Sequence, residues 1–242
     1  MPALEGRIAV VTGASRGIGH AAALGLAEAG AHVVAVARTA GGLEELDDAI
    51  RAKGGSATLV PLDLKDYAGI DRLGAALFER WGRLDILLAN AGVLGVVTPL
   101  GHLDPKVWDN ALAVNVTANW RLIRSFDPLL RRSDAGRALF VTSGITRSLP
   151  PYWGSYSITK AALEALVRTY GGEIANTSVR ANLFSPGALR THMRAQAMPG
   201  EDPDTLPKPD VVVADVVRML SPDYTENKVL FDYATGETIR FD

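Results

Sequence analysis

The chain alternates short runs of branched or aliphatic residues with longer helix-like stretches. The apolar runs are nearly continuous, as is typical of parallel strands covered by helices on both faces. Alternation of this kind indicates βαβ units, and therefore an α/β fold around a mostly parallel sheet. The runs predict strands over residues 8–11, 32–36, 58–62, 86–89, 138–142 and 179–184, and the longer stretches predict helices over residues 19–29, 43–53, 70–81, 107–131 and 156–176.

The last part of the chain is less regular. Residues 199–209 hold four prolines together with acidic residues, which predicts an exposed loop. A helix is predicted over residues 211–220, and two strands over 228–233 and 238–241. We find no repeat, low-complexity tract or domain-scale linker, so the sequence predicts a single domain over residues 1–242.

Composition narrows the function classes. Hydrophobic residues make up 48% and charged residues 21%, which disfavours disordered, collagenous and coiled-coil chains. A net charge of −2 without a basic run argues against a nucleic acid or a membrane surface as partner. The absence of cysteine excludes disulfides and thiolate metal sites, and the four scattered histidines predict no metal site. Without a leader or a long apolar stretch, we expect a cytoplasmic protein.

A glycine-rich turn directly follows the first predicted strand and opens the first helix. Gly13 permits a tight exit from the strand, Gly17 lets the backbone approach a pyrophosphate, and Gly19 allows close packing of helix on strand. The helix N-terminus then offers free N–H groups to phosphate. The alternative is a plain glycine turn, but the flanking strand and helix favour dinucleotide binding. The expected cofactor contacts here are Gly13, Ser15, Arg16, Gly17, Ile18 and Gly19.

The end of the second predicted strand bears on the choice of nicotinamide cofactor. A carboxylate there suits a free ribose 2′-hydroxyl, but this chain has Ala37, Arg38 and Thr39. A guanidinium makes forked contacts with phosphate, and Arg16 lies in the glycine turn nearby. We therefore expect NADP(H) to be preferred over NAD(H), with contacts from Arg38 and Thr39. The alternative is that both arginines are solvated surface charges.

Tyr156 and Lys160 stand at positions i and i+4 of a predicted helix and so share one face. An ammonium one turn away favours the phenolate, and we expect it to lower the tyrosine pKa toward neutrality. Tyr156 is then suited to exchange a proton with a substrate oxygen, and Ser143 to hold that oxygen. The pair alone is a weak signal, because Tyr-x-x-x-Lys also arises by chance.

Further short motifs follow the later predicted strands or, in the case of Asn115, lie within a predicted helix. With the glycine turn and with Ser143, Tyr156 and Lys160, they stand in the order of the short-chain dehydrogenase/reductase family, which the chain closely resembles over nearly its whole length. The resemblance implies a single-domain Rossmann fold, doubly wound with helices on both faces. The motifs are Asp63 and Leu64, Asn90, Ala91 and Gly92, Asn115, and Pro186 and Gly187 followed by Leu189 and Thr191.

The resemblance also implies residue roles. Asn115, Ser143, Tyr156 and Lys160 form the catalytic tetrad, in which Lys160 also binds the nicotinamide ribose and Asn115 holds a water that relays protons. Asp63 and Leu64 lie beside the adenine, the Asn90 motif steadies sheet and cofactor, and the Pro186 motif contacts the nicotinamide amide and the phosphates. Three alternatives remain: a helix-interior Asn115 satisfied by backbone, a strand-end cap at Asp63, and a helix N-cap at Thr191.

The predicted function is an NADP(H)-dependent oxidoreductase that interconverts a carbonyl compound, a ketone or aldehyde, and a secondary alcohol. The alternatives are a 3-oxoacyl thioester reductase and a non-catalytic NADP(H)-binding redox sensor. The resemblance implies that reductases of carrier-bound acyl chains have a basic residue in the loop after the catalytic helix, where the acidic surface of the carrier would dock. Here that loop, residues 176–178, is uncharged, which weakens the case for carrier-protein recognition, although Arg131 and Arg132 remain available. The resemblance also implies a homo-oligomer, a dimer or a tetramer.

The substrate pocket is expected to mix apolar walls with basic residues. An apolar or aromatic carbonyl compound fits such a pocket, and an anionic group on it is the alternative. Residues 188–209 are expected to form a lid over cofactor and substrate. The expected framing segments are 94–97, 144–147, 149–153 and 189–198, with Arg147, Arg190, His192 and Arg194 as the basic residues.

Overall fold

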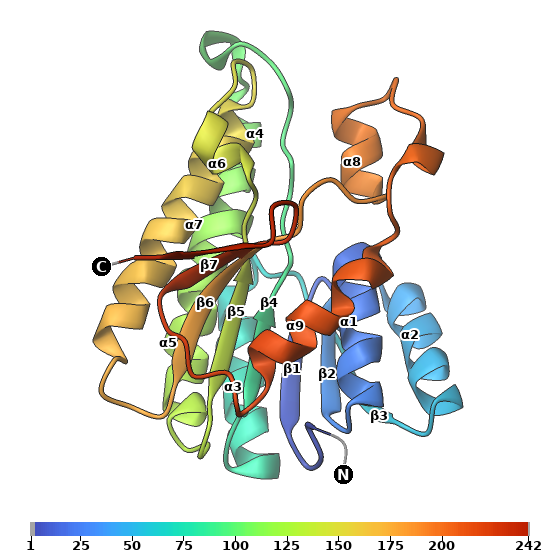
Figure 1. Ribbon diagram of the computed structural model, residues 1–242, viewed down its shortest axis with the longest axis vertical. Helices are drawn as coiled ribbons and strands as arrows, with labels where there is room; N and C mark the ends of the chain where they lie inside the picture. Colours follow the sequence, from blue (N-terminus) through green and yellow to red (C-terminus); the bar gives the residue numbers. More distant parts are fainter. Residues whose placement is uncertain (1–2, 242) are drawn as a thin grey trace.

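The computed structural model describes residues 3–241, so the two ends of the predicted domain, at residues 1–2 and 242, lie outside the described residues. Within it, eight strands form one sheet in the order β3-β2-β1-β4-β5-β6-β7-β8, parallel except for β8 (Figure 1). The predicted strand ends agree with the observed ones to within two residues. The strands are β1 (Ile8–Thr12), β2 (His32–Ala37), β3 (Ser56–Pro61), β4 (Ile86–Ala89), β5 (Arg137–Val141), β6 (Arg180–Ser185), β7 (Val229–Asp232) and β8 (Glu237–Arg240).

Helices cover both faces of this sheet (Figure 1). Side chains alternate along a strand, so Val11 of β1 packs into one apolar cluster and Val10 into the other. This arrangement confirms the predicted doubly wound α/β fold. One cluster contains α1 (Gly17–Glu28), α2 (Ala40–Ala52) and α9 (Val213–Leu220), and the other contains α3 (Tyr67–Trp81), α5 (Ala118–Leu130) and α7 (Gly154–Glu173).

The long helix predicted over residues 107–131 is not continuous. The chain forms α4 (Pro105–Leu112), then one π-helical turn, Ala113–Thr117, and then α5. A π-turn accommodates one extra residue inside an otherwise helical stretch, and such turns occur often at functional sites. Asn115 lies within it and is fully buried.

Several short elements were not predicted because none is long enough to show a period. They connect strands to longer helices around the carboxyl edge of the sheet or lie in the segment before α9. These elements are η1 (Leu100–His102), α6 (Ile145–Ser148), η3 (Pro203–Thr205) and η4 (Pro209–Val212). Another short helix, α8 (His192–Ala197), begins after Thr191, as the alternative of a helix N-cap there implied.

The C-terminal hairpin, β7 and β8, extends the sheet by two strands beyond β6. Both strands were predicted. Ile239 of β8 and the following Phe241 pack against the cluster that contains α7, and the Arg168 guanidinium of α7 lies 4.4 Å from the Phe241 ring centroid. The hairpin is thus fixed to the face of the sheet that α7 covers.

Within residues 3–241, no helix is both long enough and apolar enough to cross a lipid bilayer.

Candidate functional site

A cleft of about 1290 Å³ lies at the carboxyl ends of the strands. The strand order reverses between β1 and β4, and in open α/β sheets ligands bind at that point. Most of the predicted cofactor residues line it; only Gly19 does not. Those that do are Gly13, Ser15, Arg16, Gly17, Ile18, Arg38, Thr39, Asp63, Leu64, Asn90, Ala91, Gly92, Tyr156, Lys160, Pro186, Gly187, Leu189 and Thr191.

Gly19 lies behind the glycine turn, where it makes room for Asn90. The Asn90 Nδ2 donates to the carbonyl oxygens of Thr12, at 3.0 Å, and Gly13, at 3.3 Å. A Cβ at Gly19 would come within 2.3 Å of the Gly13 oxygen and 2.4 Å of Asn90 Nδ2. The packing role predicted for Gly19 is therefore visible in the geometry. Asn90 ties the end of β4 to the turn that follows β1.

The N-terminus of α1 opens into the cleft and fits an anionic group. Its N-cap residue, Arg16, makes no side-chain capping hydrogen bond, and the first turn holds no acidic residue. The first N–H groups of the helix are thus left to a ligand. Gly17 has a φ of 60°, a conformation that favours glycine and keeps the backbone accessible.

Two exposed guanidinium groups border the same end of the cleft. Arg16 and Arg38 both line it, and neither forms an ion pair with an acidic residue among residues 3–241. Asp63 also lines the cleft, while its Oδ1 accepts from the Lys65 N–H at 2.9 Å. Thr191 caps α8 through the Arg194 N–H, at 3.2 Å, and faces Gly17. Asp63 and Thr191 therefore both accept hydrogen bonds from nearby backbone N–H groups, as the capping alternative predicts, and both also line the cleft.

Ser143, Tyr156 and Lys160 meet at the other end of the cleft. Ser143 follows β5, and the other two residues stand one turn apart on α7. The Ser143 hydroxyl lies close enough to the Tyr156 phenol to lower the pKa of that phenol. The Lys160 Nζ donates to the Val141 carbonyl at 2.7 Å and lies 5.7 Å from the Tyr156 ring centroid. The three functional groups predicted for proton transfer thus come together.

The pKa values of this group differ from the sequence-based expectation. Burial raises the pKa of Tyr156 to about 12, and the neighbouring Ser143 hydroxyl opposes this only in part. Burial also lowers the pKa of Lys160 to about 8, against the opposing attraction of Glu164. The prediction that Lys160 brings the tyrosine pKa toward neutrality is therefore wrong. Desolvation is the largest cause of the pKa shift of both groups.

Asn115 approaches the group formed by Ser143, Tyr156 and Lys160 from the π-turn. Its Oδ1 accepts from the Val93 N–H at 2.8 Å, and its Nδ2 donates to the Val93 carbonyl and to Thr159 Oγ1, each at 2.9 Å. The two contacts with Val93 agree with the alternative of a helix-interior residue satisfied by backbone, while the third contact is to a side chain. Its Oδ1 also lies near Lys160, because both are within 3.5 Å of the Cβ position at Gly92. The proton-relay role stays a prediction.

The three arginines expected in the substrate pocket are all engaged in ion pairs. Arg147 binds the buried carboxylate of Asp232, at the end of β7, and does not line the cleft. Arg190 binds Asp204 at 3.0 Å, and Arg194 binds Glu201. The remaining walls combine apolar and polar residues. The apolar ones include Leu94, Val96, Val107, Val114, Ile145, Pro150, Trp153, Leu189 and Met193, and the polar ones include Lys106, Asn110, Ser148, His192 and Gln196.

Two acidic residues next to the site were not predicted from the sequence. The position of Asp232 at the carboxyl end of a strand was a signal that it could lie near the site. Its partner Arg147, however, lies 85 positions earlier, and no local pattern joins the two residues. Glu164 extends the Tyr156–Lys160 stripe by one more turn, and it accepts hydrogen bonds from threonines on either side of Ser143.

Comparisons with known proteins agree with this geometry. A family model described as short chain dehydrogenase matches residues 7–202. The uncharacterized oxidoreductase YciK of Escherichia coli is 36% identical over 209 residues, covering 85% of this chain and 82% of that protein. An uncharacterized NAD-dependent oxidoreductase of Mycobacterium tuberculosis is 34% identical over 204 residues, covering 78% and 74%.

Solved structures extend the match over nearly the whole chain. A short chain dehydrogenase from Pseudomonas syringae has a TM-score of 0.93 at 38% identity, covering 96% of each chain. Another, from Shigella flexneri and complexed with NADP, has a TM-score of 0.92 at 33% identity, covering 96% of this chain and 98% of that one. The matched family model, the fold and the cleft lead to one conclusion: this chain belongs to the short-chain dehydrogenase/reductase family of NAD(P)-dependent oxidoreductases.

Proposed function

We propose that the protein is an NADP(H)-dependent oxidoreductase that interconverts a ketone or aldehyde and a secondary alcohol. The observation that carries the proposal is the meeting of Ser143, Tyr156 and Lys160 in the same cleft as the open N-terminus of α1. That combination suits a bound dinucleotide and a substrate oxygen side by side. The nicotinamide, when bound, supplies or accepts the hydride.

Each residue of the group has a proposed part. Tyr156 donates its phenolic proton to the carbonyl oxygen during reduction, a step for which a tyrosine with a pKa of about 12 is fully protonated. Ser143 hydrogen-bonds the same oxygen and orients it. Lys160 is positioned by Val141 to hold the nicotinamide ribose and to support the proton transfer.

The substrate class follows from the walls of the cleft. Because Arg147, Arg190 and Arg194 are paired with acidic residues, these three arginines offer little free charge to an anionic group, although the exposed Lys106 also lines the cleft. An uncharged carbonyl compound with an apolar or aromatic substituent is therefore favoured. Residues 188–209 form the proposed lid; its two ion pairs, at Arg190 and Arg194, join residues within that segment.

The function is tested by following NADPH oxidation with a panel of aromatic and aliphatic ketones, aldehydes and 3-oxoacyl thioesters. Turnover of the neutral apolar ketones or aldehydes, with anionic analogues turned over poorly, is the expected result. Turnover confined to the thioesters would support the thioester reductase instead. Tight NADPH binding without turnover of any carbonyl, or of any alcohol with NADP⁺, would favour a non-catalytic sensor and overturn the proposal.

The preference for NADP(H) rests on the unpaired Arg16 and Arg38. The NADP complex of the Shigella flexneri relative supports it, while the Mycobacterium tuberculosis relative is named NAD-dependent. In Arg38→Asp the new carboxylate repels the 2′-phosphate, and the forked contact is lost. We expect the ratio of kcat/KM for NADPH to that for NADH to fall by roughly 10–100-fold, the equivalent of one or two charge-assisted hydrogen bonds.

The matched control is Arg124→Asp, the same charge change at an exposed position of α5 that does not line the cleft. It should leave the ratio of kcat/KM values unchanged. An unchanged ratio in Arg38→Asp as well would mean that Arg38 is merely a solvated charge.

A further inference from the structure

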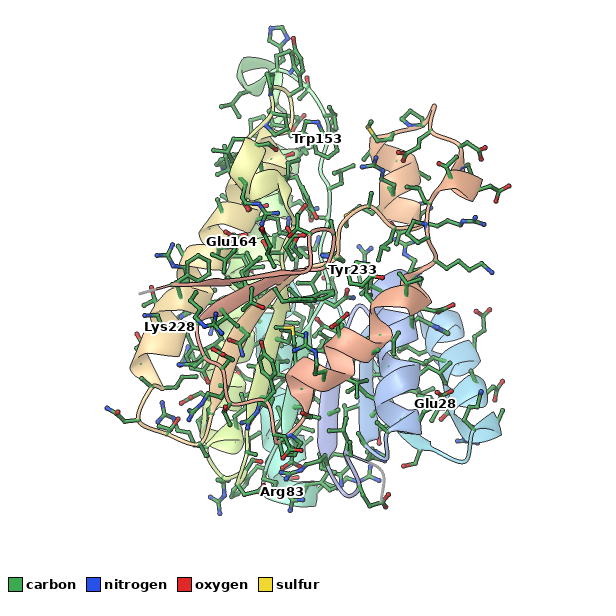
Figure 2. All side chains as sticks on the ribbon, in the orientation of Figure 1. Glu28, Arg83, Trp153, Glu164, Lys228 and Tyr233 are labelled. Carbon is green, nitrogen blue, oxygen red and sulfur yellow. The ribbon has the colours of Figure 1, made fainter. Side chains whose placement is uncertain are left out.

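Glu164 lies one helical turn beyond Lys160, so Tyr156, Lys160 and Glu164 form a stripe along one face of α7. Glu164 is partly buried and does not line the cleft. Figure 2 shows it well along α7, below Trp153 at the helix start. A carboxylate behind the catalytic pair, rather than inside the cleft, is placed to act on the protein and not on a ligand.

The Glu164 carboxylate contacts the chain on both sides of Ser143. Its Oε1 accepts from Thr142 Oγ1 at 2.7 Å and lies 2.9 Å from Thr146 Oγ1. Thr142 directly precedes the serine, and Thr146 follows it by three residues. The Thr146 hydroxyl is also 3.0 Å from the carbonyl oxygen of Ser143 itself. One carboxylate oxygen therefore joins α7 to the whole turn that presents the serine.

This attachment is the second one between α7 and the same segment. Lys160 Nζ already holds the Val141 carbonyl, one residue before Thr142, at 2.7 Å. Ser143 and Tyr156 come from different elements, so their separation depends on contacts of this kind. Hydrogen bonds to an ionised acceptor are stronger than neutral ones, and a displacement of about 1 Å in a catalytic group costs roughly 100-fold in rate.

We propose that Glu164 is a positioning residue that, through Thr142 and Thr146, holds the Ser143 turn against the Tyr156–Lys160 face of α7. The inference rests on the proposed function of Ser143 and Tyr156 in carbonyl reduction. In this proposal Glu164 touches neither substrate nor cofactor and acts through the hydroxyls of Thr142 and Thr146.

Glu164 also has an electrostatic effect that must be separated from positioning. Its charge raises the pKa of Lys160 and so opposes the effect of burial. The other titratable group facing Lys160 is Tyr156, on the same helix. The strand end at Val141 and the π-turn contribute only a carbonyl and the uncharged Asn115 amide.

Three variants separate the two effects. Glu164→Gln keeps an oxygen that accepts from both threonines but removes the charge. Thr142→Val with Thr146→Val removes both donors and keeps the charge, while Glu164→Leu removes both features. We expect kcat for ketone reduction to fall roughly 10–100-fold in Glu164→Leu and in the double valine variant, and at most about threefold in Glu164→Gln, with little change in KM for NADPH.

The control is Glu173→Leu, the same substitution at an exposed position of α7, which should retain wild-type kcat. Lysine side-chain NMR of the cofactor-free protein, with Lys160→Arg to identify the signal, gives the second readout. The Lys160 pKa should move further below about 8 in both Glu164 variants and stay unchanged in the double valine variant. Glu164→Gln would thus change the Lys160 pKa with little effect on kcat, and the double valine variant would lower kcat without changing that pKa. A general loss of stability would not produce this reversal.

Deuterium exchange of the backbone amides of residues 143–148 gives a readout that needs no turnover. It should speed up in Glu164→Leu and in the double valine variant but not in Glu164→Gln. Wild-type exchange and kcat in the double valine variant would overturn the positioning role, as would equal loss in Glu164→Gln and Glu164→Leu. An inactive wild-type protein would refute the proposed function alone, because the exchange test would still decide whether Glu164 holds the turn.

Discussion

Tyr156→Phe should lower kcat for ketone reduction by about 10³-fold, within the range that general acid catalysis contributes. The substitution removes only the phenolic oxygen, so the packing of the ring, including its 6.5 Å centroid separation from Trp153, is retained. NADPH affinity, measured by fluorescence titration, should change little. The combination of unchanged binding and lost turnover is the expected signature of a missing acid.

Tyr152→Phe is the matched control. Tyr152 stands four residues earlier, is 58% exposed and does not line the cleft. Its contact with Thr98 uses the backbone carbonyl, which the substitution leaves in place. It should therefore retain wild-type kcat. Substantial turnover by Tyr156→Phe would show that another group donates the proton, and the proposed role of the tyrosine would have to be abandoned.

The fold was predictable because its signal is local. Parallel strands buried on both faces are continuous apolar runs, and runs such as 8–11 and 86–89 fell within a residue of the observed ends. The cofactor end was predictable for a related reason. A glycine-rich turn between a strand and a helix favours an opening at the carboxyl edge of the sheet, so the places of Gly13 and Gly17 in the cleft could be expected from their sequence context.

What the sequence did not predict depends on distant partners. The pairing of Arg147 with Asp232 brings together residues from α6 and β7, and nothing near either one indicates the other. The tyrosine pKa was misjudged for the same reason. The sequence places Lys160 one turn away, but the burial that raises the pKa of Tyr156 arises from packing of the whole fold.

The π-turn is a third feature that the sequence did not predict. One extra residue between α4 and α5 leaves the apolar pattern on either side unchanged, so residues 107–131 still predict a single helix. Only the structure shows that Asn115 is placed by this insertion and that its amide is held by the Val93 backbone. The identity of the residue was predictable, but the way in which it is held was not.

Gly19→Ala should be the most damaging single-methyl change at the cofactor end. The added Cβ would overlap the Gly13 carbonyl, at 2.3 Å, and Asn90 Nδ2, at 2.4 Å. Neither neighbour can retreat without breaking the hydrogen bonds by which Asn90 ties β4 to the glycine turn. Overpacking of this kind costs roughly 1–3 kcal/mol, and the displaced turn would no longer present the start of α1 to a phosphate.

We therefore expect Tm to fall by roughly 3–10 °C, as a loss of that size implies for a domain of about 240 residues. NADPH affinity should fall by roughly 100-fold, since two hydrogen bonds to an anion are lost or misaligned. Calorimetry and fluorescence titration measure the two effects.

Gly172→Ala provides the matched comparison, because it makes the same change inside α7 at a position with no heavy atom within 4 Å of the new Cβ. There the better helix propensity of alanine should raise the free energy of unfolding by about 0.5–1 kcal/mol and leave NADPH affinity unchanged. Opposite signs for one substitution at two helical glycines would show that close approach of the backbone, and not helix propensity, requires glycine at position 19. Equal and small effects at both positions would contradict the packing argument for Gly19.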